Sequence, residues 1–183
     1  MTDEPRRRRP DERPGEIIAA ALELFSERGF AATRLDDVAA RAGLSKAAIY
    51  LYFDDKSALL KAVIQATAGA SLERIRAIAA RPEGPVAPLL RQLLLAVAGR
   101  MSGTRLPDVI KLVISESRAH PEIGRAYLEN VIGQALPLVQ ALIEQGVASG
   151  EFRRVDARLT VKCVVAPMVL AAVWRSVFEP IGA

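Results

Sequence analysis

Apolar residues recur at steps of three and four from Gly15 to the C-terminus, and no stretch alternates with a period of two. The first periodicity is that of a helix and the second that of a strand. The pattern therefore predicts an all-α chain. The first helix is expected over about 14–28, with Gly29 in the position that commonly follows a helix end. Its predicted buried face consists of Ile17, Ile18, Ala21, Leu22, Leu24 and Phe25.

Capping and helix-breaking residues divide the rest of the chain into further helices. Thr33 is expected to cap the second helix, with Asp36 as the acid of a capping box, and Ser45 is expected to cap the third. Pro137 should kink or divide a long helix, because proline lacks the amide that an inner turn needs. The last helix is apolar nearly all round and must be covered on several sides. The predicted spans after the first are about 34–41, 46–52, from Asp54 or Asp55 to 80, 86–101, 106–119, 122–148 and 157–178.

Residues 34–53 read RLDDVAARAGLSKAAIYLYF, which is two short helices joined by a turn that contains glycine. This pattern is typical of a helix-turn-helix, whose second helix enters the major groove of DNA. Val38 is expected to bury the first of these helices, and Leu44 and Ile49 to hold the second against the core. The motif therefore predicts a DNA-binding domain built from three helices.

The second helix of this motif is expected to present small and polar side chains outward. Ala47 and Ala48 let a helix backbone approach base edges, and alanine methyl groups can contact thymine methyl groups. Tyr50, Tyr52 and Lys56 are placed to reach phosphates with hydroxyl and ammonium groups. The predicted DNA-binding residues are Thr33, Arg34, Ser45, Lys46, Ala47, Ala48, Tyr50, Leu51, Tyr52 and Lys56.

On these residues the chain resembles the TetR family of bacterial transcriptional regulators, over about residues 14–60. Two positions depart from the family's pattern: Tyr52 stands where histidine is most frequent, and Leu51 where arginine or another polar residue is common. The resemblance implies a homodimer in which the helices after Pro137 and Ala157 of each subunit form a four-helix bundle. The matching residues are Leu24, Phe25, Gly29, Phe30, Thr33, Asp37, Val38, Ala39, Ala42, Gly43, Ser45, Tyr50, Phe53, Lys56 and Leu59.

The helix pattern and the resemblance together divide the chain into three parts. Residues 1–13 are expected to be a disordered arm, 14–56 the helix-turn-helix domain, and 57–183 a helical domain for effector binding and dimerisation. Residues 6–9, four successive arginines, are either part of a solvated tail or an arm that contacts DNA. Bulk charge does not point to the DNA-binding part, because 1–56 carry ten Lys and Arg against eleven Asp and Glu.

Composition narrows the function classes. The 183 residues are 51% hydrophobic and 25% charged, which permits a packed core and excludes wholesale disorder. A single Cys, Cys163, expected to be buried in the last helix, and a single His do not supply a disulfide or a Cys/His metal site. No catalytic motif, metal or cofactor is predicted, so an enzyme is not expected. The longest apolar run, 163–174, is shorter than the roughly 18 residues of a membrane span, and a cytoplasmic location without a membrane is expected.

Few aromatic and many Ala, Val and Leu residues in 57–183 favour an apolar effector. Aromatic and Met residues at helical spacing more often belong to the packed core than to a pocket. A purely structural role for these residues is therefore the alternative interpretation. The predicted function is a dimeric transcriptional repressor that a small apolar effector releases from a near-palindromic DNA operator. Two alternatives remain: an architectural or partner-regulated DNA-binding protein without an effector, and a helical enzyme or lipid carrier with a coincidental motif. The candidate pocket residues are Arg118, Tyr127, Met168 and Trp174.

Overall fold

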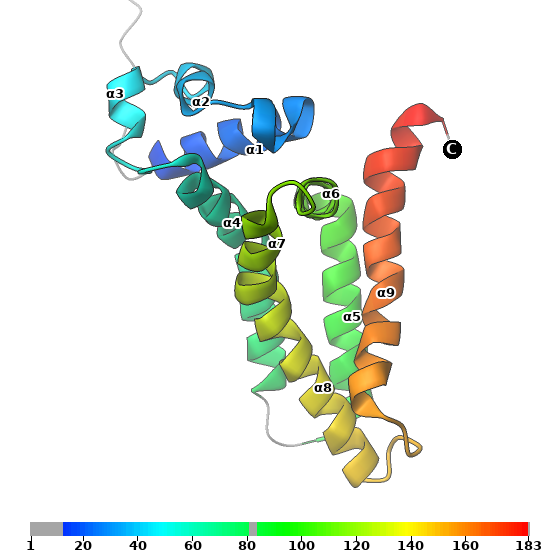
Figure 1. Cartoon of the computed structure of the whole chain (residues 1–183). Coiled ribbons are helices and arrows are strands. Elements are labelled where there is room, and N and C mark those ends of the chain that lie inside the picture. The colour runs from blue at the N-terminus through cyan, green and yellow to red at the C-terminus, as the bar shows by residue number, and fades with distance from the viewer. Residues whose placement is uncertain (1–12, 81–83, 183) are drawn as a thin grey trace, which may run out of the picture. The chain divides into compact units, whose positions relative to one another are not determined.

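The computed structural model describes residues 13–80 and 84–182, which are helical or lie in short connections, with no strand among them. The predicted all-α fold class is therefore confirmed. The chain forms two compact units, Met1–Val63 and Ile64–Ala183, whose helices are drawn in Figure 1. The four arginines at 6–9 lie outside the described residues.

The first unit encloses its core completely. Ile17, Val38, Ile49 and Leu59 are 0% exposed and come from four different helices, so each helix is fixed by apolar packing. The rings of Phe25 and Phe30 add a tilted aromatic contact with centroids 5.4 Å apart. The helices of this unit are α1 (Arg13–Ala32), α2 (Leu35–Arg41), α3 (Lys46–Ile49) and the beginning of α4 (Lys56–Ala79).

Two glycines with positive φ change the direction of the chain at the ends of α1 and α2. Gly29, with φ 81° and ψ 165°, adopts a conformation that only glycine reaches readily, and it breaks α1 where the sequence predicts its end. Gly43, with φ 68°, follows α2. There the amide of Leu44 bonds to Ala39 O at 2.8 Å, and the amide of Gly43 to Ala40 O at 3.1 Å. This Schellman arrangement ends α2 and directs the chain into α3.

The second unit is a bundle of longer helices around an apolar core. Glu151, in the α8–α9 connection, caps α5, because its carboxylate accepts hydrogen bonds from the amides of Val86 at 2.6 Å and Ala87 at 2.8 Å. The core residues at its centre are Ile75, Ile78, Val86, Leu93, Val139, Leu142, Ile143, Ala157 and Val161. The elements are the rest of α4, α5 (Val86–Gly103), α6 (Leu106–Glu116), α7 (Pro121–Tyr127), η2 (Leu128–Ile132), α8 (Gly133–Ala148), α9 (Ala157–Val173), η3 (Trp174–Phe178) and η4 (Glu179–Ile181).

The helical stretch that begins at Pro121 is interrupted, but not at the predicted residue. The interruption is the π-helical segment η2, after which the amide of Gly133 bonds to Leu128 O, five residues earlier. Pro137 lies inside α8, about one turn further along. The carbonyl that a proline at this position leaves unbonded is that of Gly133. The π-helical segment η2 is thus followed directly by Gly133, the residue whose carbonyl loses its hydrogen bond because of Pro137.

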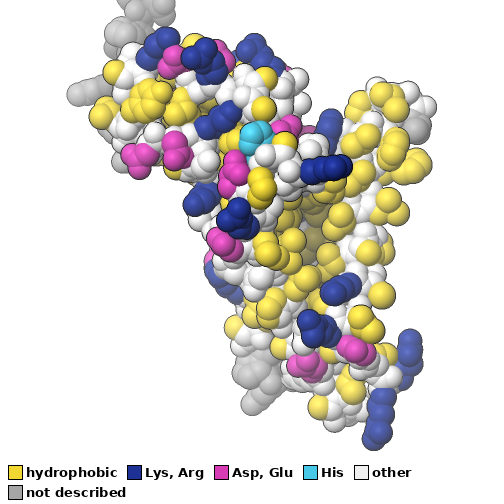
Figure 2. Space-filling model, viewed as in Figure 1, with side chains coloured by type: hydrophobic (Ala, Val, Ile, Leu, Met, Phe, Trp, Pro, Cys, Tyr) yellow, Lys and Arg dark blue, Asp and Glu magenta, His cyan; other side chains and the backbone are white. Residues whose placement is uncertain are grey.

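The helix α9 and its continuation are poorly covered within the chain. Leu159, Leu170 and Trp174 are 59%, 62% and 49% exposed, and hydrophobic side chains follow this helix in Figure 2. Two stretches, Pro121–Ala148 and Ala157–Ile181, are long and apolar enough to cross a membrane, with 22% and 11% of their most apolar windows buried. Cys163 is exposed, so its predicted burial is wrong: α9 places it on the uncovered side.

Candidate nucleic-acid interface and effector cavity

The surface of α3 combines small residues with exposed aromatic and aliphatic side chains. Tyr50, Leu51 and Tyr52 are 52%, 84% and 39% exposed, next to the exposed Ala47. The helix itself ends at Ile49, earlier than predicted. The following turn continues by hydrogen bonds between residues three apart, such as Leu51 N–H to Ala48 O at 3.3 Å. Exposed apolar side chains grouped on a well-packed unit are typical of a binding surface.

The polar residues at the start of α3 already have partners within the unit. The hydroxyl of Ser45 accepts a hydrogen bond from Ala48 N–H at 3.2 Å, so the predicted cap is confirmed. Lys46 Nζ pairs with the carboxylate of Asp36 at 2.7 Å, although the lysine side chain is 77% exposed. An exposed ion pair contributes only about 0–1 kcal/mol. A DNA phosphate can therefore compete with Asp36 for Lys46.

Lys56 holds the backbone together instead of pointing outward. Its Nζ donates to the carbonyl oxygens of Phe30, Ala31 and Thr33 at 2.7, 3.1 and 3.0 Å, and lies 4.4 Å from the centre of the Phe30 ring. An ammonium group has three donors, and the backbone accepts all of them. In this arrangement the ammonium group faces backbone carbonyls, and its predicted phosphate contact stays a prediction. The residue fastens the α1–α2 connection to the beginning of α4.

Thr33 also points inward. It is 1% exposed, and its hydroxyl donates to Gly29 O at 2.8 Å and contacts Leu24 O at 3.3 Å. The predicted cap is wrong, because the break at Gly29 leaves carbonyls that this hydroxyl satisfies. The predicted DNA contact of Thr33 stays a prediction. The cap of α2 is Arg34, an exposed residue whose amide donates to the Asp37 carboxylate at 3.3 Å.

The helix α2 is fastened to α1 by one arginine. Arg41 donates to Glu23 at 3.0 Å and to both carboxylate oxygens of Glu27 at 3.1 and 3.2 Å. These hydrogen bonds, that of Glu27 foremost, raise the pKa of Arg41 above its ordinary value. Arg41 is thus occupied by carboxylates and holds the helix-turn-helix in place.

The second unit contains an apolar cavity of about 200 Å³ whose walls come from α4 to α9. Two predicted pocket residues, Tyr127 and Met168, lie in its wall. Burial raises the pKa of Tyr127 from 10.0 to about 12, so its hydroxyl stays neutral even in moderate alkali. Arg118 and Trp174 are not among the residues of this wall: Arg118 is exposed beyond the end of α6, and Trp174 packs against Phe178 with ring centroids 5.1 Å apart.

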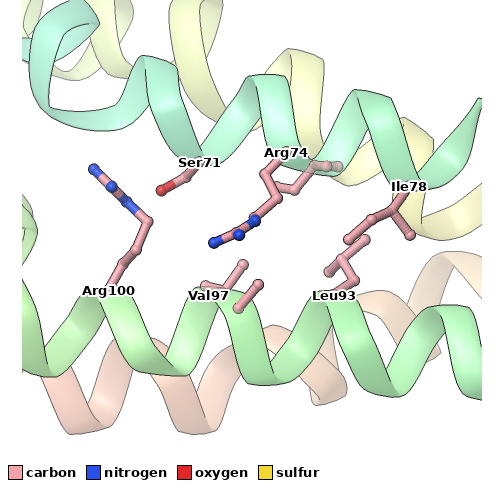
Figure 3. Close-up of a pocket in the computed structure, with 8 residues that line it drawn as sticks. Ser71, Arg74, Ile78, Leu93, Val97 and Arg100 are labelled. Atoms are coloured by element: carbon pink, nitrogen blue, oxygen red, sulfur yellow. The ribbon is translucent and has the colours of Figure 1, made fainter.

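One polar part of the cavity wall was not predicted. Ser71 on α4 lines both the cavity and the narrow space between α4 and α5, which Figure 3 shows. Its Oγ and the Nε of Arg100 are buried without a hydrogen-bond partner in the part of the chain that the structure describes. Hydrophobic periodicity assigns Ser71 to a helix but does not reveal which atoms it faces. The sequence feature that could have indicated a polar part of this wall is the pair Arg74 and Arg100, which stand among apolar residues on two predicted helices.

Two protein-family models match the chain, one for each part. A model described as bacterial regulatory proteins of the tetR family matches residues 17–63. A second, described as a tetracyclin repressor-like C-terminal domain, matches residues 80–179. Between them the two matches leave out residues 64–79, which form most of α4, and the two ends of the chain.

Individual relatives agree with this assignment. The HTH-type transcriptional activator FasR of Mycolicibacterium smegmatis is 46% identical over 55 residues, which are 30% of this chain and about a quarter (25%) of FasR. A TetR/AcrR-family regulator from Thermobifida fusca is 30% identical, with a TM-score of 0.64 over 94% of this chain and 88% of the other. FadR from Bacillus subtilis, solved with stearoyl-CoA, has the same fold: the TM-score is 0.74 at 21% identity, over 92% and 89% of the two chains.

Proposed function

The chain belongs to the TetR family of bacterial regulatory proteins, and we propose that it is a homodimeric, cytoplasmic repressor that a small apolar effector releases from its operator. The observation that carries this proposal is the exposed surface of α3, held on a closed and fully packed unit. Such a helix fits a major groove, with small residues near the bases and polar ones near the phosphates. The proposed DNA contacts are Arg34, Ser45, Lys46, Ala47, Ala48, Tyr50, Leu51 and Tyr52.

The proposed dimer explains the uncovered face of α9. Leu159, Val169 and Leu170 are exposed on a helix that is apolar nearly all round. A second copy that packs α8 and α9 against the same helices would bury this surface by two-fold symmetry. It would also account for the two long apolar helices without a membrane. Two recognition helices related by such an axis require half-sites about one helical turn apart, or slightly more.

The proposed effector site is the cavity of the second unit. Its wall is apolar apart from Ser71 and the neutral Tyr127, which suits an apolar ligand. FadR, which shares the fold, was solved with an acyl ligand, stearoyl-CoA. An effector that binds better to a dimer geometry in which the half-site spacing is lost would weaken DNA binding. A tenfold change needs a difference of about 1.4 kcal/mol between the two geometries.

The first test is selection of bound duplexes from a random pool at two salt concentrations. The proposal expects a near-palindromic consensus and affinity that falls with salt. On the selected operator, Lys46→Ala and Tyr50→Ala should each lose measurable binding. Arg91→Ala, which removes an exposed charge from α5 in the other unit, is the control and should bind normally. Unchanged affinity in both test variants contradicts the assignment of the interface.

A thermal-shift screen separates this proposal from a regulator without an effector. A ligand that binds the native state raises the melting temperature by mass action. Medium-chain apolar compounds should therefore stabilise the protein, and the same compounds should release it from the selected operator. Stabilisation without release would contradict the repressor mechanism while leaving the cavity as a binding site.

A further inference from the structure

Two buried polar atoms between α4 and α5, one of them in the cavity wall, have no hydrogen-bond partner within the described residues. These atoms are Ser71 Oγ and Arg100 Nε. Buried polar groups in folded proteins are almost always hydrogen-bonded. Arg100 uses one terminal nitrogen, Nη2, to bind Thr67 O at 2.9 Å, so its side chain is fixed across the α4–α5 space while Nε remains available. Two such donors on facing helices favour a hydrogen-bond partner other than the described residues.

The surroundings of these atoms carry positive charge. Arg74 and Arg100 line the space between α4 and α5 together with Ser71, and Figure 3 shows the two arginine side chains directed into it on either side of the serine hydroxyl. Among the described residues that line this space there is no Asp or Glu. The neighbouring acid Glu73 is paired with Arg76. Two guanidinium groups around one hydroxyl donor form a setting for an anion.

The charged space and the apolar cavity share a wall. Ser71, Ile75, Leu93 and Val97 line both of them. A group bound at Ser71 and Arg100 is therefore adjacent to the cavity, and a chain attached to that group can enter it. A cavity of about 150 Å³ lined by apolar residues accommodates benzene. The cavity of about 200 Å³ in this protein therefore suits a chain of about eight carbons.

We propose that the effector is an amphipathic molecule with an anionic head group and an apolar chain. The space between α4 and α5 has no room for a water molecule, so the carboxylate or phosphate head binds at Ser71 on the cavity side, where Arg100 and the exposed Arg74 turn towards it. The chain occupies the cavity. The inference rests on the proposed function, because it names the chemistry of the ligand for the same effector site. The serine hydroxyl and Arg100 Nε donate hydrogen bonds to the head group, and Arg74 contributes its charge.

The experiment compares probes that have the same chain and different heads. Binding of octanoate, octyl phosphate and octanol to the full chain is measured by calorimetry. Because charge-assisted hydrogen bonds are the stronger ones, an anionic probe should bind about tenfold or more tightly than octanol. Whichever of octanoate and octyl phosphate binds more tightly identifies the head as carboxylate or phosphate. In Ser71→Ala and Arg100→Gln this preference should shrink towards equality, while the affinity for octanol stays unchanged.

The experiment has a matched control variant in the same helix as Arg100. Arg91→Gln removes one exposed charge from the same helix, α5, and should keep the preference. If Arg100→Gln does not fold by circular dichroism, Ser71→Ala and Arg74→Gln provide the test. Equal affinity of the wild type for anionic probes and octanol overturns the inference and leaves the apolar effector site intact. Binding of none of the three probes contradicts both the inference and the effector part of the proposed function, whereas operator selection tests the DNA-binding part separately.

Discussion

Lys56 and Thr33 in the first unit, and Ser71 and Arg100 in the second, are all polar side chains that reach between packed helices. In the first unit every donor of these groups meets a backbone carbonyl, and the apolar core is closed. In the second unit two donors lack partners among the described residues, the serine of the two lines a cavity, and a helix face is uncovered. The difference indicates that the first unit is complete by itself, whereas the second leaves room for other molecules.

The same substitution made in each unit should expose this difference most strongly. Leu24 is 1% exposed and Leu170 is 62% exposed. Leu24→Ala should lower the free energy of unfolding by about 3–4 kcal/mol, because it leaves a cavity in a closed core. Leu170→Ala should act mainly on the dimer, so that its effect depends on protein concentration. Urea unfolding at several protein concentrations measures both effects.

A result in which Leu170→Ala destabilises the protein equally at all concentrations would contradict the proposed role of α9. Sedimentation of the same variant provides the check, since a weakened dimer should dissociate at a higher concentration than the wild type. Leu24→Ala is the control in that measurement, because a residue enclosed in the first unit should not change the association.

Replacement of Lys56 tests whether the first unit depends on its internal polar bonds. Lys56→Met keeps much of the side-chain length but leaves three carbonyls without their donor, so a loss of about 3 kcal/mol is expected. Lys61→Met, at an exposed position of the same helix, should change stability by less than about 0.5 kcal/mol. Thermal unfolding compares the two. A stable Lys56→Met variant with weaker DNA binding would instead restore the phosphate role.

The buried tyrosine of the second unit predicts a loss of stability in alkali. The pKa of Tyr127 is raised from 10.0 to about 12 in the folded chain, so the unfolded chain loses this proton first as the pH rises. Its contribution is fully present below pH 10 and is lost between pH 10 and about 12, up to roughly 2–3 kcal/mol. Urea unfolding from pH 9 to 12 should show a steeper decline for the wild type than for Tyr127→Phe. Parallel curves would show that the tyrosine is not buried in solution.

The smallest effect on stability is expected at the surface pair of Lys46 and Asp36. Asp36→Asn removes the charge partner of an exposed lysine, so the free energy of unfolding should change by less than about 0.5 kcal/mol. Operator affinity should increase, since a phosphate no longer competes with Asp36 for Lys46. Binding titrations at fixed salt measure this change, and a decrease in affinity would mean that Asp36 positions Lys46 productively.

The fold of the first unit was largely predictable because local signals and packing agree. Gly29 breaks α1 and Ser45 caps α3 as their types suggest. The directions of Thr33 and Lys56 were not predictable, because a side chain beside a helix end can satisfy inner carbonyls or face solvent with the same spacing. The distinction depends on which carbonyls the break at Gly29 leaves open, and this is a tertiary property.

In the second unit the helices were predictable, but their surroundings were not. Periodicity placed α5 and α9 closely, yet it did not separate Tyr127 and Met168, which line the cavity, from Trp174, which does not. The burial expected for Cys163 assumed that an apolar helix is covered by its own chain. An apolar helix face indicates that the face is covered, but the sequence does not show whether its own chain or another molecule covers it.

The three carbonyl bonds of Lys56 also bear on the ions that surround DNA. Each lysine or arginine that neutralises a phosphate releases about 0.9 condensed counterion from the duplex, and these released ions set the salt dependence of binding. Lys56 is held by three carbonyls of its own unit, so we expect that it does not displace a counterion. Operator binding by this protein should therefore be less sensitive to salt than a count of the positive charges around its helix-turn-helix suggests.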